Sequence, residues 1–308
     1  MNLCRNPVWV ENQKCYFGCG NCRCCRLNRR SEWTLRMTHE ASRHNYKAVF
    51  VGLSYDEQHI PKHRTLVKRD IQLFFKSLRR KIDYYYKKEG LKAPKIKYYA
   101  CGEYGPQTHR PHYHLIIYGL DMKFADMIYK TWNKCQPQGF HCSLVRTRRA
   151  YGYTAGYASK KLGTRYGKHF KEKYPNKCPE FQLQSLNLGS NFLDDPNNYD
   201  KETGMYRHGK EWRILPRYYR KKLNIDAKVY KNVIEEYHEK VYQKVIAAYG
   251  KEGMYISDKT LPLDSKITYA GRWVTAKFWS CLDLVRKHCD DILKDREKEW
   301  RNKAVALA

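Results

Sequence analysis

The spacing of apolar residues divides most of the chain into strands and helices. Residues 48–55, 96–101 and 112–119 form apolar runs of strand length, and a short loop rich in Gly and Pro joins the last two. Residues 70–87 instead repeat apolar side chains at a period of 3.6, which predicts an amphipathic helix. The remaining segments predict helices over 31–46, 121–134, 226–249 and 271–300, a strand over 140–146 and a loop-rich stretch over 164–222. This order predicts an α+β fold with an antiparallel central sheet, helices packed on one face and the other face open.

Residues able to bind a metal cluster at one end of this predicted sheet. His112 and His114 begin an apolar strand, and both imidazoles lie on one face because successive strand side chains alternate. If the preceding strand forms a hairpin in which Glu103 pairs opposite His112, its carboxylate shares that face, about 5 Å away between Cβ atoms. Two imidazoles and one carboxylate predict an open site for Mg²⁺ or Mn²⁺ rather than a closed structural zinc site.

Other residues compete for the third ligand position. His109 extends the pattern to His109-x-x-His112-x-His114, although it lies in the turn between the two strands. Asp56 and Glu57 are more distant candidates. The alternative for the histidine pair is two ordinary strand residues that bind no metal.

A second group, of two tyrosines and a lysine, follows in a predicted helix that ends near residue 163. Tyr153, Tyr157 and Lys160 stand at positions i, i+4 and i+7, which places them on one stripe of the helix. A phenol can attack phosphorus, and with an ordinary pKa of about 10 it needs help from a metal and a nearby cation such as Lys160. The alternative is that both tyrosines pack against the sheet. Gly152 and Gly156 weaken such a helix, which we interpret as a backbone that DNA approaches closely.

Composition supports a nucleic-acid partner. The 308 residues include 60 Lys and Arg against 31 Asp and Glu, a formal net charge of +29, and 14% of the residues are aromatic. Basic grooves with aromatic stacking platforms bind single-stranded nucleic acid. No apolar stretch reaches the 18 or so residues that a membrane span needs, and the first residues lack the apolar core of a signal peptide. We therefore expect no membrane partner, a reducing cytoplasm, and cysteines that do not form a disulfide framework.

These motifs together resemble a known family of enzymes. Residues 101–105 (CGEYG) and 110–114 (RPHYH) resemble the second motif of the HUH endonucleases, in which U is a bulky apolar residue. Residues 153–161 (YTAGYASKK) are similar to the two-tyrosine motif, and residues 50–55 with Pro61 resemble the first motif. The likeness extends over roughly residues 1–223 and is to the replication initiators of the gokushovirus-like Microviridae, small single-stranded DNA phages.

The resemblance implies a rolling-circle replication initiator in the cytoplasm of a bacterial host. Such an enzyme nicks the origin in replicative-form DNA, and one tyrosine becomes linked to the 5′ phosphate while the free 3′ hydroxyl primes synthesis. The second tyrosine cuts the regenerated origin, and the displaced strand is closed into a circle. A host polymerase is implied. Residues 204–211 nearly match a phosphate-binding loop, but Glu211 replaces its Ser or Thr, so we expect no ATPase and a host helicase.

The cysteine-rich start of the chain resembles the start of the same family. Four of the twelve cysteines could supply the sulfurs of one tetrahedral structural Zn²⁺: Cys4, Cys19, Cys22 and Cys25. Cys15 or Cys24 could replace one of them, and unligated thiols are the alternative. We therefore divide the chain into a zinc-binding segment (1–30), an HUH endonuclease domain (31–223) and a helical extension of unknown role (224–308).

Two rival functions remain open from the sequence. One is another HUH enzyme, such as a plasmid relaxase or a single-strand transposase. The other is a non-enzymatic basic DNA-binding protein with a zinc module, which gives no reason for the spacing of the histidines and tyrosines. Metal dependence separates the two classes, because simple DNA binding survives EDTA and nicking does not.

Overall fold

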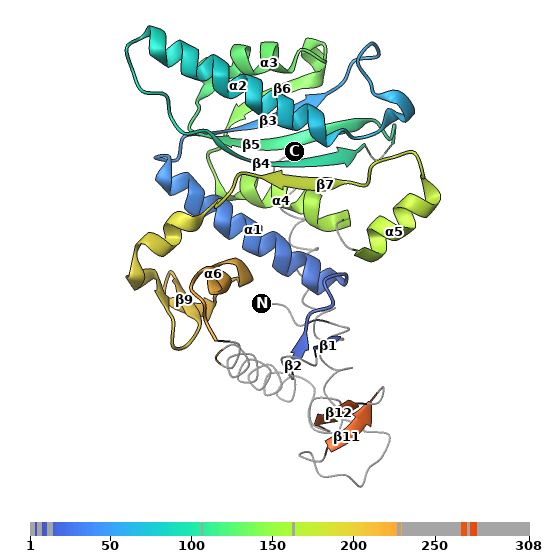
Figure 1. Cartoon of the computed structure of the whole chain (residues 1–308), viewed down its shortest axis with the longest axis vertical. Helices are drawn as coiled ribbons and strands as arrows, with labels where there is room; N and C mark the ends of the chain where they lie inside the picture. The colour runs from blue at the N-terminus through green and yellow to red at the C-terminus, as the bar shows by residue number, and fades with distance from the viewer. Residues whose placement is uncertain are drawn as a thin grey trace, which may run out of the picture. The chain divides into compact units, whose positions relative to one another are not determined.

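The apolar runs of the sequence form the middle of a five-stranded sheet in the computed structural model (Figure 1). Its strand order is β6-β3-β5-β4-β7, and every neighbouring pair is antiparallel. The strands are β3 (Ala48–Ser54), β4 (Lys97–Tyr104), β5 (Pro111–Tyr118), β6 (Phe140–Leu144) and β7 (Phe181–Gln184). The predicted α+β class and the antiparallel central sheet are therefore confirmed.

The structure describes most of the chain and divides it into two units. The described residues are 4, 8–10, 15–105, 107–161, 164–226, 229, 266–269 and 272–275. One unit is Arg26–Asn198, which contains the five-stranded sheet, and the other combines Met1–Cys25 with Tyr199–Ala308. The three-part division expected from the sequence stays a prediction.

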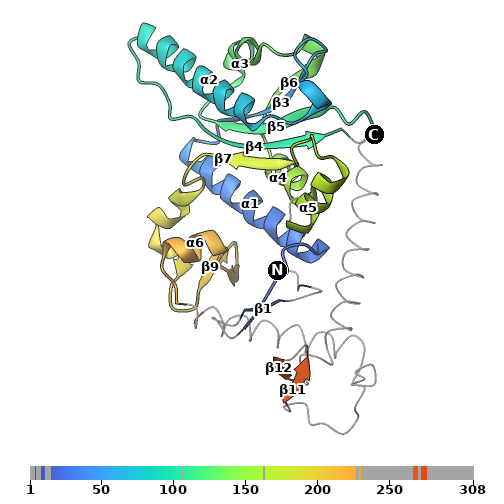
Figure 2. The same ribbon diagram turned by 45° about the vertical axis from the view of Figure 1, so that its right-hand side comes forward.

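Helices cover both faces of the sheet. On one face lie α2 (Lys68–Lys88) and α3 (Ala125–Trp132), and on the other lie α1 (Arg23–Arg43) and α4 (Arg148–Lys161), as Figure 1 and Figure 2 both show. A further helix, α5 (Thr164–Lys173), follows α4. The prediction that helices occupy only one face is therefore wrong.

The side chains of β5 give the physical reason for this second helical layer. Leu115 and Ile117 are fully buried in a core shared with α2, while Ile116 and Tyr118 are fully buried in a second core with Met37 of α1. A strand with both faces buried reads as a continuous apolar run instead of an alternating one. Burying such a strand requires helices on both sides of the sheet.

Several element boundaries differ from the predicted ones. α1 begins at Arg23, within the cysteine-rich segment, although the sequence predicted a helix only over 31–46. The stretch expected to be loop-rich contains α5 and β7, and β7 completes the sheet by pairing with β4. Short 3₁₀ turns lie at Lys62–Arg64, Met122–Phe124, Pro137–Gly139, Ser190–Asp194 and Pro196–Asn198.

The second unit contains small antiparallel sheets and one short helix. Its described elements are β1 (Val8–Val10), β2 (Cys15–Phe17), β8 (Tyr199–Asp200), β9 (Met205–His208), β10 (Glu211–Ile214), α6 (Arg217–Lys222), β11 (Lys266–Tyr269) and β12 (Arg272–Thr275). The helix predicted over 271–300 cannot begin at its first residues, because β12 pairs there with β11. The rest of that helix, and almost all of the one predicted over 226–249, lie outside the described residues.

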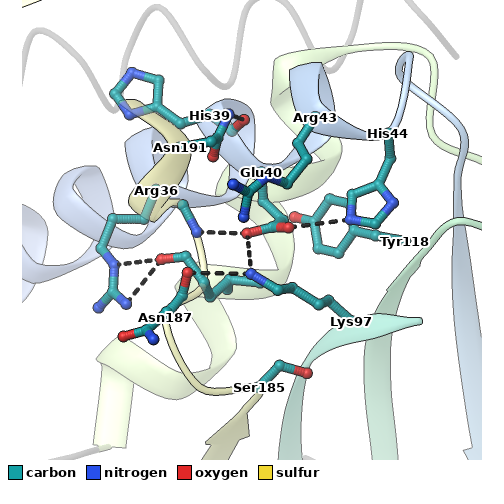
Figure 3. A network of polar contacts seen from close by, with 12 residues as sticks. Arg36, His39, Glu40, Arg43, His44, Lys97, Tyr118, Ser185, Asn187 and Asn191 are labelled. Atoms are coloured by element: carbon teal, nitrogen blue, oxygen red, sulfur yellow. Dashed lines mark hydrogen bonds and ion pairs between the residues drawn. The ribbon is translucent and has the colours of Figure 1, made fainter. Parts of the chain in front are cut away.

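A buried charge network attaches α1 to the sheet (Figure 3). The carboxylate of Glu40 is fully buried, lies 3.0 Å from Lys97 Nζ on β4, and accepts a 2.6 Å hydrogen bond from the Gly189 amide. Its other oxygen lies 3.0 Å from His44 Nε2. Burial raises the pKa of Glu40, but the hydrogen bonds from His44, Gly189 and Lys97 outweigh it and lower that pKa to about 2. The network therefore stabilises the ionised carboxylate.

The same network requires a glycine at position 189. Gly189 has φ +76, and a Cβ there would lie 2.4 Å from the carbonyl oxygen of Arg36. The Arg36 guanidinium donates from Nε and Nη2 to the carbonyl of Leu188, at 3.1 and 2.9 Å. The loop after β7 can therefore approach α1 closely enough for its backbone to contact both Glu40 and Arg36.

We expect Glu40→Gln to lower the free energy of unfolding by roughly 3 kcal/mol at pH 7, because it leaves the buried Lys97 ammonium without its counter-charge. Urea denaturation of the whole chain measures this change. Asp126→Asn is the control: its pair with Lys130 is exposed, and such pairs contribute less than about 1 kcal/mol.

The pH dependence provides an internal check. Because the folded-state pKa of Glu40 lies below its ordinary value, its contribution is present above about pH 5 and is lost as the pH falls toward 2. The difference between wild type and Glu40→Gln should therefore shrink in acid. A difference that stays constant down to pH 3 would contradict this account.

Candidate active site and metal-binding clusters

The hairpin of β4 and β5 brings the three predicted metal ligands together. Glu103 pairs directly opposite His112, so the register assumed from the sequence is confirmed. Glu103 Oε2 lies 3.5 Å from His114 Nε2 and 3.8 Å from His112 Nε2. One ligand atom from each of the three lies within 4.8 Å of the others, which is a separation that a single ion can bridge.

The polar atoms of this triad fit a divalent cation. Glu103 Oε2 and both ring nitrogens of His114 are buried and have no hydrogen-bond partner among the described residues. Leaving such atoms unsatisfied costs free energy, and a bound ion removes that cost. His112 Nδ1 lies 3.1 Å from the carbonyl oxygen of Arg110, a contact that orients its Nε2 toward the triad. Two imidazoles and one carboxylate leave coordination positions open for a substrate.

Both predicted tyrosines lie beside this triad, on α4. The ring of Tyr157 stacks on the ring of His114, with centroids 4.0 Å apart and planes 6° from parallel. The hydroxyls of Tyr153 and Tyr157 contact each other, and Tyr153 is 50% exposed. Burial raises the pKa of Tyr157, and the contact with Tyr153 raises it further. The site thus presents one accessible phenol next to a second, partly covered one.

The two glycines of α4 have a different role from the one inferred from the sequence. They face Arg30 of α1: a Cβ on Gly156 would lie 3.4 Å from Arg30 Nε, and one on Gly152 would lie 3.7 Å from Arg30 Nη2. Arg30 Nε also donates a 2.8 Å hydrogen bond to the Gly152 carbonyl. The close approach is therefore that of an arginine side chain from a neighbouring helix, and the interpretation that DNA approaches this backbone is wrong.

The remaining sequence candidates are distributed as follows. Lys160 lies on α4, but its side chain is outside the described part of the chain, so its catalytic role stays a prediction. Asp56 accepts hydrogen bonds from His59, and Glu57 pairs with Arg64 and Arg110. Neither these acids nor His109 belongs to the metal-binding groups found among the described residues.

Sequence reasoning missed several residues that support the site. Phe50 on β3 lies between the site and β6, with its ring 5.9 Å from His114, 6.1 Å from Tyr153 and 5.8 Å from His141. Its position could have been found from strand alternation, because β3 pairs with β5 and places Phe50 on the face of the histidines. Arg30 gave no comparable signal, since it stands in a run of basic residues.

Tyr113, between the two histidine ligands, fixes the strand that carries them. Its side chain is fully buried on the opposite face of the sheet. The hydroxyl lies 2.8 Å from that of Tyr55 and accepts a 2.8 Å hydrogen bond from the Val67 amide, just before α2. The bulky residue between the histidines therefore carries a polar atom that links β5 to the start of a helix.

The second metal-binding group is the cysteine cluster of the other unit. It consists of the four cysteines singled out from the sequence, Cys4, Cys19, Cys22 and Cys25, whose sulfurs all lie within 4.8 Å of one another. Cys24 is fully buried next to them but is not part of the group. The side chain of Cys15 lies outside the described residues.

Among the described residues, no helix combines the length and apolar character needed to cross a membrane.

Comparison with known proteins adds independent evidence. Residues 48–162, which contain the histidines, Glu103 and both tyrosines, match the family model of the replication-associated protein ORF2. No solved structure matches the chain.

Similar curated proteins come from three viruses. The replication-associated protein ORF2 of Spiroplasma virus 4 is 27% identical over 250 residues, 74% of each chain. The replication-associated protein VP4 of Bdellovibrio phage phiMH2K is 31% identical over 47% of this chain and 49% of its own length. For the replication-associated protein ORF4 of Chlamydia phage 1, the values are 34%, 36% and 26%. The chain thus spans about half or less of the latter two. The resemblance to the replication initiators of Microviridae that the motifs indicated is confirmed: this chain is a relative of the phage replication-associated proteins.

Proposed function

We propose that the chain initiates rolling-circle replication by nicking single-stranded DNA at a phage origin, through a tyrosine that becomes linked to the 5′ phosphate. The observation that carries the proposal is the stacking of Tyr157 on His114, because it places a pair of phenols against the group that fits a divalent cation. A metal next to a nucleophile is the equipment that phosphodiester cleavage requires.

The triad would hold the scissile phosphate in position. Glu103, His112 and His114 would bind Mg²⁺ or Mn²⁺, which when bound polarises a non-bridging phosphate oxygen. The partly buried setting of the three side chains strengthens their interaction with charge, because water screens less there. Phe50, between the ligands and the edge strand β6, offers an apolar surface beside the phosphate.

Tyr153 is the better placed of the two tyrosines for the first attack, because half of its side chain is exposed to an incoming strand. Its Oη forms a bond to phosphorus while the bond from phosphorus to the 3′ oxygen breaks. The phenolic proton passes to solvent, and the leaving 3′ oxygen takes up a proton to become a 3′ hydroxyl. Lys160, one turn beyond Tyr157, would add positive charge near the reacting phosphate.

Tyr157 would then act on the regenerated origin. The first phosphotyrosine bond conserves the energy of the phosphodiester, so that attack by a 3′ hydroxyl can rejoin the displaced strand without ATP. The substrate would be the origin in single-stranded and replicative-form DNA in the host cytoplasm. A host helicase and polymerase would supply strand separation and synthesis.

We expect wild-type protein with Mn²⁺ to become linked to the 5′ side of a labelled single-stranded origin oligonucleotide, as seen on a denaturing gel. Tyr153→Phe should lose the first cut, Tyr157→Phe should retain it, and the double variant should form no linked product. Tyr84→Phe, at an exposed tyrosine on α2, serves as the matched control. Wild-type protein that binds the oligonucleotide but never becomes linked to it would favour a non-enzymatic DNA-binding protein.

We expect EDTA to abolish nicking and Mn²⁺ to restore it, because the triad needs an ion to neutralise charge at the phosphate. His114→Ala should lower the nicking rate by at least about 100-fold while leaving oligonucleotide binding in EDTA within about twofold of wild type. His169→Ala, at an exposed histidine on α5, should nick as wild type does. Undiminished nicking by His114→Ala would exclude the triad as the metal site.

A further inference from the structure

We propose that Cys4, Cys19, Cys22 and Cys25 bind one structural Zn²⁺, at a site that is separate in residues and chemistry from the proposed nuclease site. None of the four forms a disulfide within the described part of the chain, and the sulfurs of Cys4 and Cys22 lie 3.8 Å apart. A zinc tetrahedron with Zn–S bonds of about 2.3 Å has edges of about 3.8 Å. A disulfide would require about 2.05 Å. The spacing therefore fits four ligands around one ion.

The backbone around the cluster is arranged to stabilise thiolates. The amide of Cys19 donates to the sulfur of Cys4 at 3.2 Å, and the amide of Cys22 donates to the sulfur of Cys19 at 3.3 Å. The amide of Cys25 donates to the sulfur of Cys22 at 3.4 Å. Zinc binds the thiolate form, and hydrogen bonds to ligand sulfurs orient them and disperse their charge.

Two glycines allow the chain to fold tightly around the sulfurs. A Cβ on Gly18 would lie 2.8 Å from the sulfur of Cys25, a separation too short for any side chain. Gly20 has φ +74, so the turn between Cys19 and Cys22 uses a backbone conformation that glycine adopts without strain. Both positions therefore serve the convergence of the sulfurs.

Four cysteines can also hold a [4Fe–4S] cluster. Such a cluster places its own irons and sulfides between the thiolates and holds them further apart than the ligands of one zinc ion. The 3.8 Å separation of Cys4 and Cys22 therefore favours zinc.

The surrounding segment needs such a cross-link. Between Cys4 and Cys19 lie β1 and β2, which pair with each other alone over three residues each. An isolated two-stranded sheet is marginally stable in water. A metal that joins Cys4 to the turn before α1 closes the loop containing this hairpin, and zinc binding of this kind contributes directly to folding.

Metal analysis of the purified full-length protein tests the proposal without any assay of nicking. We expect about one zinc per chain in wild type, about one in His114→Ala and less than about 0.2 in Cys22→Ser. Cys142→Ser, at a cysteine outside the cluster, should retain its zinc. Absence of zinc from wild type, presence of iron with sulfide, or retention of zinc by Cys22→Ser would overturn the proposal.

A titration of wild-type protein with a mercurial reagent avoids any dependence on the folding of a variant. Zinc should be released in proportion as four thiols per chain react, followed with a metal-sensitive dye. Release of zinc without reaction of these thiols would overturn the assignment.

A separate observation concerns the hairpin of β9 and β10. Trp212 pairs opposite Arg207, so both side chains share one face of the hairpin. Trp212 is 53% exposed, and Arg207 and Lys210 are also exposed. Aromatic rings stack on bases while neighbouring cations bind phosphates, and the chain's charge of +29 favours a polyanion over an apolar partner.

We infer that this hairpin binds single-stranded DNA by stacking Trp212 on a base, an inference that rests on the proposed function. Fluorescence anisotropy with an oligo-dT strand in EDTA measures binding without cleavage. Trp212→Ala should weaken binding roughly tenfold, and Trp212→Phe should weaken it less.

Leu186→Ala is the control, because Leu186 is 90% exposed and apolar but lies away from this hairpin in the sequence. Binding by Trp212→Ala equal to wild type would overturn the inference. A wild-type protein that binds DNA but never becomes linked to it in Mn²⁺ would overturn the nuclease proposal alone, so the two failures are distinguishable.

Discussion

The pairing of β4 with β5 is the constraint on which the candidate site depends. Strand side chains alternate, so a slip of one residue would turn His112 and His114 to the opposite face and separate them from Glu103. The register is fixed from both sides, because odd positions of β5 pack against α2 and even positions pack against α1 and α4. The polar end of the hairpin is thereby held by the apolar remainder of the same strands.

The central part of this arrangement could be predicted from the sequence, because it depends on local patterns. The apolar runs, the short loop between β4 and β5 and the pairing of Glu103 with His112 followed from strand periodicity and hairpin geometry. The position of Tyr157 beside His114 is different. A helical spacing places two tyrosines on one stripe, but it does not say which strand that stripe meets.

What could not be predicted depends on contacts between segments far apart in the chain. β7 has four residues in a stretch rich in Pro and Asn, and it is a strand because β4 offers it a free edge. Likewise, the helices on the second face reflect partners for Ile116 and Tyr118 that no local pattern specifies. The buried pair of Glu40 and Lys97 joins two residues that look like ordinary surface charges in the sequence.

The contact between Arg30 and the glycines of α4 has a mechanical consequence for the tyrosines. The guanidinium lies where side chains at positions 152 and 156 would otherwise stand, so the two helices approach to the depth of an arginine. Any added side chain at either position would act as a spacer and lift α4 away from α1. The lateral reach of the phenols over the histidines is thus calibrated by the absence of two methyl groups on the neighbouring face of the helix.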